Sequence, residues 1–212
     1  RKPGTCPVKP GNAVSSQVKE LPVFHLLAGP NGAGKSTLYR ALVRDGLIAK
    51  DMPFVNADLY ERDHLQLMAD PESRSQAART WAEAERTRLL IAGDSFVSET
   101  VFSHVSKLAL IEDATAHGYM VALHVVALDD PQRLLGRVKA RVREGGHDVP
   151  ADRILARYPR TLHNLTKAVR RASVAYLYEA RETSDGGPQL VAICEGHQTT
   201  RVVAAAPRCA EQ

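Results

Sequence analysis

The sequence predicts an α/β fold in which helices cover both faces of a parallel sheet of about five strands. From Leu21 onward, short apolar runs alternate with longer amphipathic segments, a pattern typical of parallel strands joined by crossover helices. The first apolar run leads through a glycine-rich turn into an amphipathic segment, which is the order strand, loop, helix. The chain has 212 residues, enough for one domain with a buried core.

Each expected element follows from its apolar pattern. The strands are short apolar runs: Val23–Ala28, Phe54–Asn56, Ser95–Ser98, Met120–Leu128 and Gln189–Cys194. The helices are longer segments with helical periodicity: Lys35–Arg44, Pro71–Ala92, Val105–His117, Pro131–Glu144, Ala151–Tyr158 and Arg160–Ala180. Pro159 separates the last two, because proline breaks or kinks a helix. Apolar residues from Leu162 to Tyr176 then predict a helix face on the core.

A glycine-rich stretch after the first expected strand matches a phosphate-binding loop at every required position. It reads Gly29-Pro30-Asn31-Gly32-Ala33-Gly34-Lys35-Ser36 and fits G-x-x-x-x-G-K-[ST]. Glycines permit the tight turn that points successive backbone N–H groups at an anion. Lys35 then reaches the β- and γ-phosphates, and the Ser36 hydroxyl binds Mg²⁺. We expect this loop, extended to Thr37, to bind a nucleoside triphosphate with Mg²⁺.

Polar residues at the ends of two further strands are candidates for chemistry. Asp58 follows the second expected strand, and Glu99 and Thr100 follow the third. Ligands of open α/β sheets bind outside the carboxyl ends of the strands. Asp58 could therefore accept the proton of an acceptor hydroxyl, while Glu99 and Thr100 hold the acceptor. A helix N-cap or a solvated loop carboxylate is the alternative for each acid.

The positive charge of the chain is concentrated in one segment. Between residues 133 and 160 there are eight basic residues and three acidic ones, and the whole chain has a net charge of +4. Arg133, Arg137 and Arg141 share one helix face, and a glycine-rich elbow, Gly145-Gly146, joins two basic helices. This favours a lid that closes over phosphates and supplies arginines to the transition state; solvated helix faces are the alternative. Only Tyr158 is interleaved with the arginines, which disfavours a nucleic-acid stacking surface.

Composition also gives a domain organisation. Residues 1–20 are rich in proline and lack apolar periodicity, so we expect a flexible leader. The catalytic domain is expected over residues 21–195, with the lid at about 133–160 and a C-terminal tail at 196–212. No run approaches the roughly 18 apolar residues of a membrane span. The cysteines, Cys6, Cys194 and Cys209, predict neither disulfides nor a zinc site and indicate a cytoplasmic protein.

Several motifs occur in an order that resembles a known family. They are Gly29–Thr37, Phe54-Val55-Asn56-Ala57-Asp58, Ser98-Glu99-Thr100, Gly145-Gly146-His147-Asp148-Val149-Pro150, Arg157-Tyr158-Pro159-Arg160 and Leu162-His163-Asn164-Leu165. Together they resemble zeta-toxin-like P-loop kinases, particularly the bacterial branch with a Gly-Gly-His-x-Val-Pro lid. The resemblance extends from about Leu21 to Glu195.

The resemblance implies transfer of the ATP γ-phosphate to a hydroxyl of UDP-N-acetylglucosamine. It also implies Mg²⁺ as cofactor and an antitoxin protein as partner. By position, Asp58 matches the family's catalytic base, and Glu99 and Thr100 match its substrate-contacting pair, with which we group Asn56. Arg141 and Arg157 are the expected phosphate-contacting arginines, with Arg137 and Arg143 as alternates.

Two other functions remain open from the sequence. A polynucleotide 5′-hydroxyl kinase would explain the basic cluster, although not its position beside a glycine-rich elbow. A nucleotide-dependent switch acting on a protein partner would explain the phosphate loop. Against the switch, the sequence lacks both the Asn-Lys-x-Asp run of guanine recognition and the Leu-Ser-Gly-Gly-Gln signature of transporter ATPases.

Overall fold

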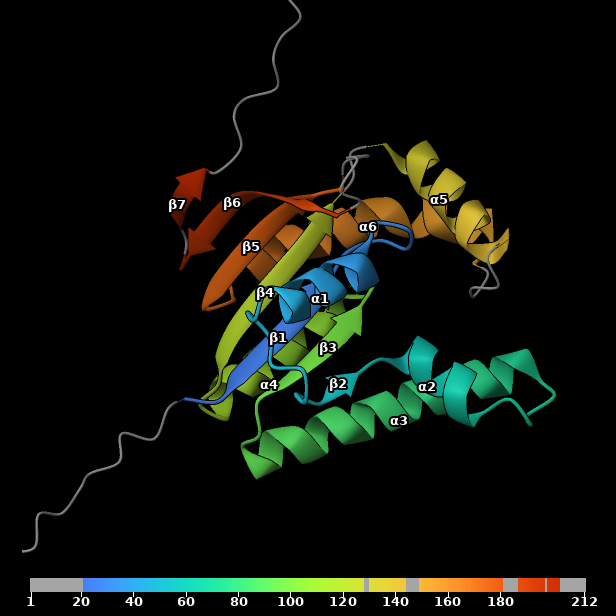
Figure 1. Cartoon of the computed structure of the whole chain (residues 1–212), viewed down its shortest axis with the longest axis horizontal. Coiled ribbons are helices and arrows are strands. Elements are labelled where there is room, and N and C mark those ends of the chain that lie inside the picture. The colour runs from blue at the N-terminus through green and yellow to red at the C-terminus, as the bar shows by residue number, and fades with distance from the viewer. Residues whose placement is uncertain (1–20, 128–129, 144–148, 181–186, 197, 203–212) are drawn as a thin grey trace, which may run out of the picture.

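A seven-stranded sheet forms the centre of the described structure (Figure 1). The structure is a computed structural model that describes residues 21–127, 130–143, 149–180, 187–196 and 198–202. The strands lie in the order β2-β3-β1-β4-β5-β6-β7. Their bounds are β1 Val23–Ala28, β2 Phe54–Val55, β3 Phe96–Thr100, β4 Met120–Ala127, β5 Val174–Glu179, β6 Gln189–Glu195 and β7 Gln198–Val202. The first five strands in this order are parallel. Strand β6 is antiparallel to β5, and β7 is antiparallel to β6.

Helices cover both faces of the sheet, which confirms the predicted fold class. Their bounds are α1 Lys35–Arg44, α2 Ala57–His64, α3 Pro71–Ala92, α4 Ala109–Ala116, α5 Pro131–Arg143 and α6 Ala151–Val169, with a 3₁₀ turn, η1, at Val105–Leu108. Figure 1 shows α2 and α3 side by side near the β2 edge, at the lower right of the view, with α5 above them at the upper right. Among the described residues, no helix is both long and apolar enough to cross a membrane.

The core consists of two hydrophobic clusters, one on each face of the sheet. The first joins Phe24, Leu26, Leu123 and Val125 to α3, α4 and the C-terminal half of α6. The second joins Leu27 and Val126 to α1, α5 and the N-terminal half of α6. Helix α6 therefore takes part in both clusters, and the alternation of side chains along β1 and β4 separates them.

The sheet has more strands than the five expected, because β5 and β7 were not predicted. The sequence predicted a helix over Arg160–Ala180, but α6 ends at Val169 and residues Val174–Glu179 form a strand. Ala172 and Tyr176 continue the helical spacing of α6 by coincidence, whereas Val174, Tyr176 and Tyr178 alternate with Ala175 and Leu177 as a strand requires. Strand β7 lies within the segment predicted as a tail, and it pairs with β6.

Helix α6 is continuous through Pro159, where the sequence predicted a break between two helices. Proline removes one backbone hydrogen bond from a helix interior. Buried residues on both sides of it, Ile154 and Leu165, anchor the two halves in the core. Packing therefore outweighs the local cost of the proline.

Candidate active site

The phosphate loop connects β1 to α1, as predicted, and its glycines are required by their surroundings. Gly29, Gly32 and Gly34 have φ angles of 153°, 82° and 102°, which other residues rarely adopt. A Cβ at Gly32 would lie 2.8 Å from the carbonyl oxygen of Leu134, and one at Gly29 would collide with the carbonyl of Val126. The loop is thus closely packed against β4 and α5.

Lys35, the first residue of α1, lies at the centre of a buried polar network. Its Nζ donates hydrogen bonds to the carbonyl oxygens of Gly29 (3.0 Å) and Pro30 (3.2 Å). It also lies 3.6 Å from Glu99 Oε1. The other carboxylate oxygen of Glu99 accepts hydrogen bonds from Ser36 Oγ (3.3 Å) and Asn56 Nδ2 (3.0 Å). Glu99 therefore connects the loop to the end of the second strand.

Asn56 is the N-cap of α2, a helix that the sequence did not predict. Its Oδ1 accepts hydrogen bonds from the backbone N–H groups of Asp58 (2.9 Å) and Leu59 (3.2 Å). Because Asn56 provides the cap, the side chain of Asp58 does not have to. Asp58 lies in the first turn of α2, exposed toward a cleft.

Helix α2 is fixed to α3 by an aromatic stack and an ion pair. The rings of Tyr60 and Trp81 stack with centroids 3.9 Å apart and an interplanar angle of 5°. Arg74 Nε lies 3.1 Å from Glu61 Oε1, and Arg74 Nη1 also donates to the carbonyl of Met68. These contacts give Asp58 a rigid support.

The loop after β3 is held in a strained conformation by α6. Phe102 is fully buried and has a φ of 64°, unusual for a bulky residue. The Nδ2 of buried Asn164 donates to its carbonyl oxygen at 3.1 Å. The Phe102 N–H in turn points to Thr100 Oγ1 at 3.4 Å. Asn164 thereby helps to position the segment that carries Thr100.

One cleft of about 280 Å³ brings seven of the predicted site residues together. Its walls come from the phosphate loop, α2, α3, the loop after β3 and α6. The predicted site residues that line it are Asn31, Lys35, Asn56, Asp58, Glu99, Thr100 and Arg157. Segments far apart in the sequence thus meet at the carboxyl ends of β1, β2 and β3.

The predicted lid arginines have different positions. Arg157 lines the cleft. Burial, and then the positive charges of Arg153, Arg160 and Arg79, lower its pKa. Arg137 instead donates to the carbonyl oxygen of Ala180 at 3.1 Å.

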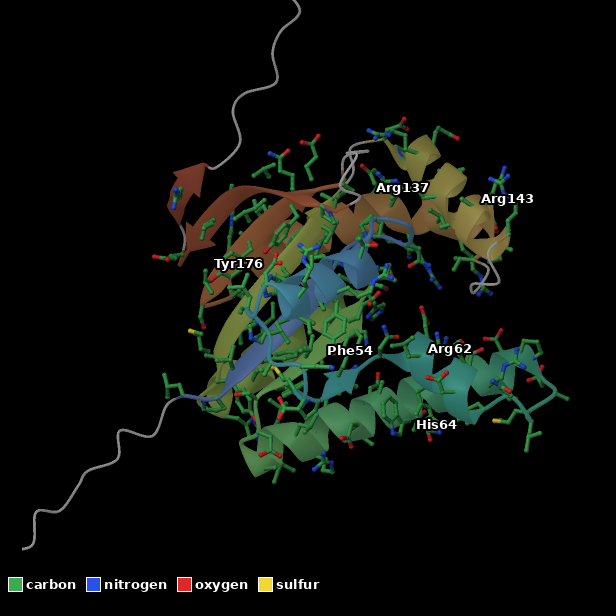
Figure 2. All side chains as sticks on the ribbon, viewed as in Figure 1. Phe54, Arg62, His64, Arg137, Arg143 and Tyr176 are labelled. Atoms are coloured by element: carbon green, nitrogen blue, oxygen red, sulfur yellow. The ribbon has the colours of Figure 1, made fainter. Side chains whose placement is uncertain are left out.

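The remaining arginine candidates lie on α5. Figure 2 shows Arg137 on the side of α5 toward the sheet, and Arg143 on the opposite side. The side chain of Arg141 and the elbow at residues 145–148 lie outside the described part of the chain.

Helix α3 contributes cleft residues that the sequence analysis missed, chiefly Arg79 and Arg86. A signal was present in the helical periodicity. The buried residues of α3 are Ala78, Ala82, Arg86 and Leu89, so Arg86 occupies a position where the apolar stripe predicts a hydrophobic side chain. A charged residue at such a position often serves a ligand or a buried partner.

The loop fits a nucleoside triphosphate and Mg²⁺. Its positive φ angles form a concave backbone of the kind that binds anions, and it leads into a helix N-terminus. Lys35 supplies a cation, and the Ser36 hydroxyl lies beside the Glu99 carboxylate. Oxygen ligands of this kind, together with phosphates and waters, suit Mg²⁺.

Comparisons with known proteins agree with the motifs. The family model of the zeta toxins matches residues 11–185. The fold is similar to a structure of the PezAT chromosomal toxin–antitoxin system of Streptococcus pneumoniae, with a TM-score of 0.59 and 18% identity. That match covers 83% of this chain and 74% of the other.

Two further structures share the fold. AvrRxo1-ORF1:-ORF2 with ATP matches with a TM-score of 0.65 and 16% identity, over 84% of this chain and 60% of the other. The Pnkp1/Rnl/Hen1 RNA repair complex matches with a TM-score of 0.56 and 19% identity, over 72% of this chain and 48% of the other. This chain thus spans less than two thirds of either of these two chains.

Proposed function

Because this chain belongs to the zeta toxin family of P-loop kinases, we propose that it transfers the γ-phosphate of ATP to a hydroxyl of a sugar nucleotide such as UDP-N-acetylglucosamine. One observation supports this most directly. A phosphate loop and an exposed carboxylate from a different strand end, Asp58, line the same cleft. A kinase needs this pairing of a donor site with a base on the acceptor side.

The donor side would hold ATP through the loop backbone and Lys35. Lys35 is 6% exposed and bonded to loop carbonyls, so binding of the phosphates requires it to exchange these acceptors for phosphate oxygens. Ser36 and Glu99 would hold Mg²⁺, which neutralises phosphate charge when bound. Arg157 lies in the same cleft and would stabilise negative charge on the phosphoryl group during transfer.

The acceptor side would use Asp58 as the base. The acceptor oxygen attacks the γ-phosphorus while the bond to the oxygen bridging the β- and γ-phosphates breaks, so that ADP leaves. The proton of the acceptor hydroxyl passes to the Asp58 carboxylate. Thr100 and Asn56 line the cleft between the two sides and would orient the acceptor.

The test of this proposal is an assay with labelled ATP and a panel of sugar nucleotides, with mass analysis for an added phosphoryl group. Asp58→Asn should keep ATP binding and lower kcat by at least ~100-fold, the lower range for a lost general base. Asp63→Asn is the matched control, since Asp63 is an exposed acid of the same helix paired with Arg62. Turnover of the Asp58 variant at the rate of the unmodified chain would remove Asp58 from the mechanism.

A toxin role is part of the same proposal. We propose that the kinase acts in the cytoplasm, with residues 133–160 as its lid, and that an antitoxin protein restrains it. Expression of the chain in bacteria should then arrest growth, whereas the Asp58→Asn variant should not. If the unmodified chain and the Asp58→Asn variant both arrest growth, toxicity does not depend on phosphoryl transfer.

A polynucleotide 5′-hydroxyl kinase is the second candidate. The cationic residues of the cleft, Arg79, Lys107 and Arg153, and the fold shared with the RNA repair complex favour it. Labelling of an oligonucleotide, with binding that weakens steeply as salt rises, and no labelling of sugar nucleotides would support this function over the first.

A further inference from the structure

Arg86 is a charged residue at a core position of α3. The buried stripe of this helix consists of Ala78, Ala82, Arg86 and Leu89, and Arg86 is only 7% exposed. The same residue lines the cleft. Its guanidinium therefore lies at the cleft floor, between the core and the space available to a ligand.

The guanidinium of Arg86 has few partners for a buried cation. Its Nη1 lies 3.4 Å from Ser98 Oγ, the one hydrogen bond that it makes in the described part of the chain. Its Nε is buried and has no hydrogen-bond partner among the same residues. No carboxylate forms an ion pair with it there. Burial lowers the pKa of Arg86, and the negative charge of Glu83 opposes this shift in part, but an arginine stays protonated in proteins.

The acids around Arg86 are already paired with other cations. Glu83 lies 3.5 Å from Lys107, Glu61 lies 3.1 Å from Arg74, and Glu99 lies 3.6 Å from Lys35. Each of these three acids lines the cleft. The charge of Glu83 still acts on Arg86, since it opposes the lowering of the arginine's pKa, but among the described residues no carboxylate lies within ion-pair distance of Arg86.

Arginines from α3 and α6 also make the walls of the cleft cationic. Arg79 lies two helical turns before Arg86 on α3, and within the described part of the chain it donates hydrogen bonds only to the neutral side chains of Ser75 and Gln76. Arg153 and Arg157 face the cleft from α6. The arginines of α3 and α6 are close enough for Arg79 to lower the pKa of Arg157. Two cationic walls therefore face one another over a cationic floor.

We propose that Arg86 is the floor of an anion subsite that binds a phosphate group of the acceptor, with Arg79 at its rim. This inference rests on the proposed kinase function and names the residue that would bind the phosphate of its acceptor. A planar guanidinium with unused N–H groups binds phosphate oxygens in pairs, with charge-assisted hydrogen bonds. The subsite lies on the acceptor side, because Arg86 donates a hydrogen bond to Ser98. Ser98 directly precedes Glu99 and Thr100 in the chain.

The position of Arg86 favours a small acceptor over a nucleic-acid strand. A polymer backbone is read from exposed lysine and arginine side chains along a surface. Arg86 is instead more than nine-tenths buried at the floor of a cleft of about 280 Å³. A terminal or bridging phosphate of a small molecule reaches such a floor more readily than a phosphodiester inside a strand.

The test compares Arg86→Met with a matched control on the same helix. Arg88 is also on α3 but is exposed and paired with Glu85, so Arg88→Met removes a similar side chain away from the cleft. We would measure KM for ATP, KM for UDP-N-acetylglucosamine and the thermal midpoint of the ligand-free protein. The subsite predicts that Arg86→Met raises KM for the sugar nucleotide by ~10-fold or more, as expected for a lost charge-assisted contact, and leaves KM for ATP within about twofold.

Stability separates a ligand role from a structural one. Removal of a buried charge without a counter-ion should leave the thermal midpoint of the ligand-free protein unchanged or higher. A lower midpoint together with equal changes in both KM values would show that Arg86 supports the fold, and would overturn the inference. An unchanged KM for the sugar nucleotide would overturn it as well.

A binding measurement keeps this inference distinct from the kinase proposal. With a non-hydrolysable ATP analogue and Mg²⁺ filling the phosphate loop, UDP should raise the thermal midpoint of the unmodified chain but not that of Arg86→Met. If no acceptor is phosphorylated but UDP binding depends on Arg86, the kinase proposal fails and the subsite stands. If UDP gives the same shift in both proteins, or none in either, the subsite is wrong.

Discussion

At the scale of single residues, Glu99 makes the contacts that join donor and acceptor sides. The resemblance of its motifs to the family implied a substrate-contacting role for Glu99. In the structure its carboxylate reaches Lys35, Ser36 and Asn56, so one side chain contacts the loop, the start of α1 and the N-cap of α2. A change at Glu99 should affect the response to Mg²⁺ as well as to the acceptor.

We expect Glu99→Gln to raise the Mg²⁺ concentration needed for half-maximal activity by roughly 10–100-fold, as found for groups that orient metal ligands. Glutamine keeps the shape but loses the charge opposite Lys35. The measurement is a Mg²⁺ titration of phosphoryl transfer. Glu112→Gln is the control, because Glu112 pairs with Arg171 away from the cleft. An unchanged Mg²⁺ requirement would restrict Glu99 to acceptor binding.

At the scale of elements, α2 is the support of the proposed base and depends on α3 for its position. Its eight residues are too few for a helix that is stable by itself. The Asn56 cap, the Tyr60–Trp81 stack and the Glu61–Arg74 pair hold it. The position of Asp58, the proposed base, should therefore respond to a substitution in α3 outside the proposed ATP and acceptor sites.

Trp81→Ala should lower the free energy of unfolding by about 2–3 kcal/mol, less than for a fully buried tryptophan because Trp81 is half-buried. It should also reduce kcat more than it changes KM for ATP, since α2 loosens while the loop does not. Denaturant unfolding and steady-state kinetics measure the two effects. Trp81→Phe should restore most of both; a Phe variant as impaired as the Ala variant would show that ring stacking is not what positions α2.

At the scale of the whole molecule, a polar chain crosses the parallel sheet on the face covered by α1 and α5. The ring nitrogens of His25 and His124 lie 3.2 Å apart, and the other nitrogen of His124 lies 3.4 Å from the Tyr178 hydroxyl. Burial, followed by the charge of His25, lowers the pKa of His124 to about 3. Burial also lowers the pKa of His25. At a pH between its lowered pKa and the ordinary histidine value, each ring is neutral in the folded protein and protonated in the unfolded chain.

The buried His25 and His124 rings should make the stability of the protein sensitive to mild acid. Between about pH 6.5 and pH 3 the unfolded state binds a proton at His124 that the folded state excludes, so the free energy of unfolding falls as pH decreases. The slope is about 1.4 kcal/mol per pH unit for one such group. Denaturant unfolding between pH 7 and pH 5 should show a shallower slope in His124→Gln. His163→Gln, at an exposed histidine, should keep the slope of the unmodified chain; equal slopes in all three proteins would refute the assignment.

The sequence predicted the conformation of the phosphate loop better than the rest of the candidate site, for a physical reason. A phosphate loop is local, and its glycines, Lys35 and Ser36 are adjacent in the chain. The acceptor side depends on packing between distant elements, so α2 and the cleft-facing Arg86 could not be read from spacing alone. Strand β5 was missed because its apolar residues also fit the helical repeat of α6. Pro159 was given too much weight, since tertiary contacts on both sides of it stabilise the helix.

Pro159 has a mechanical consequence for the cleft. The segment before it carries Arg153 and Arg157, whereas the segment after it, with Asn164 and Leu165, is buried beside the strained loop of Phe102. A proline leaves a helix one hydrogen bond short, so the straight course of α6 depends on the packing of Ile154 before Pro159 and Leu165 after it. A core substitution at Ile154 would therefore reach the cleft indirectly, through the positions of Arg153 and Arg157.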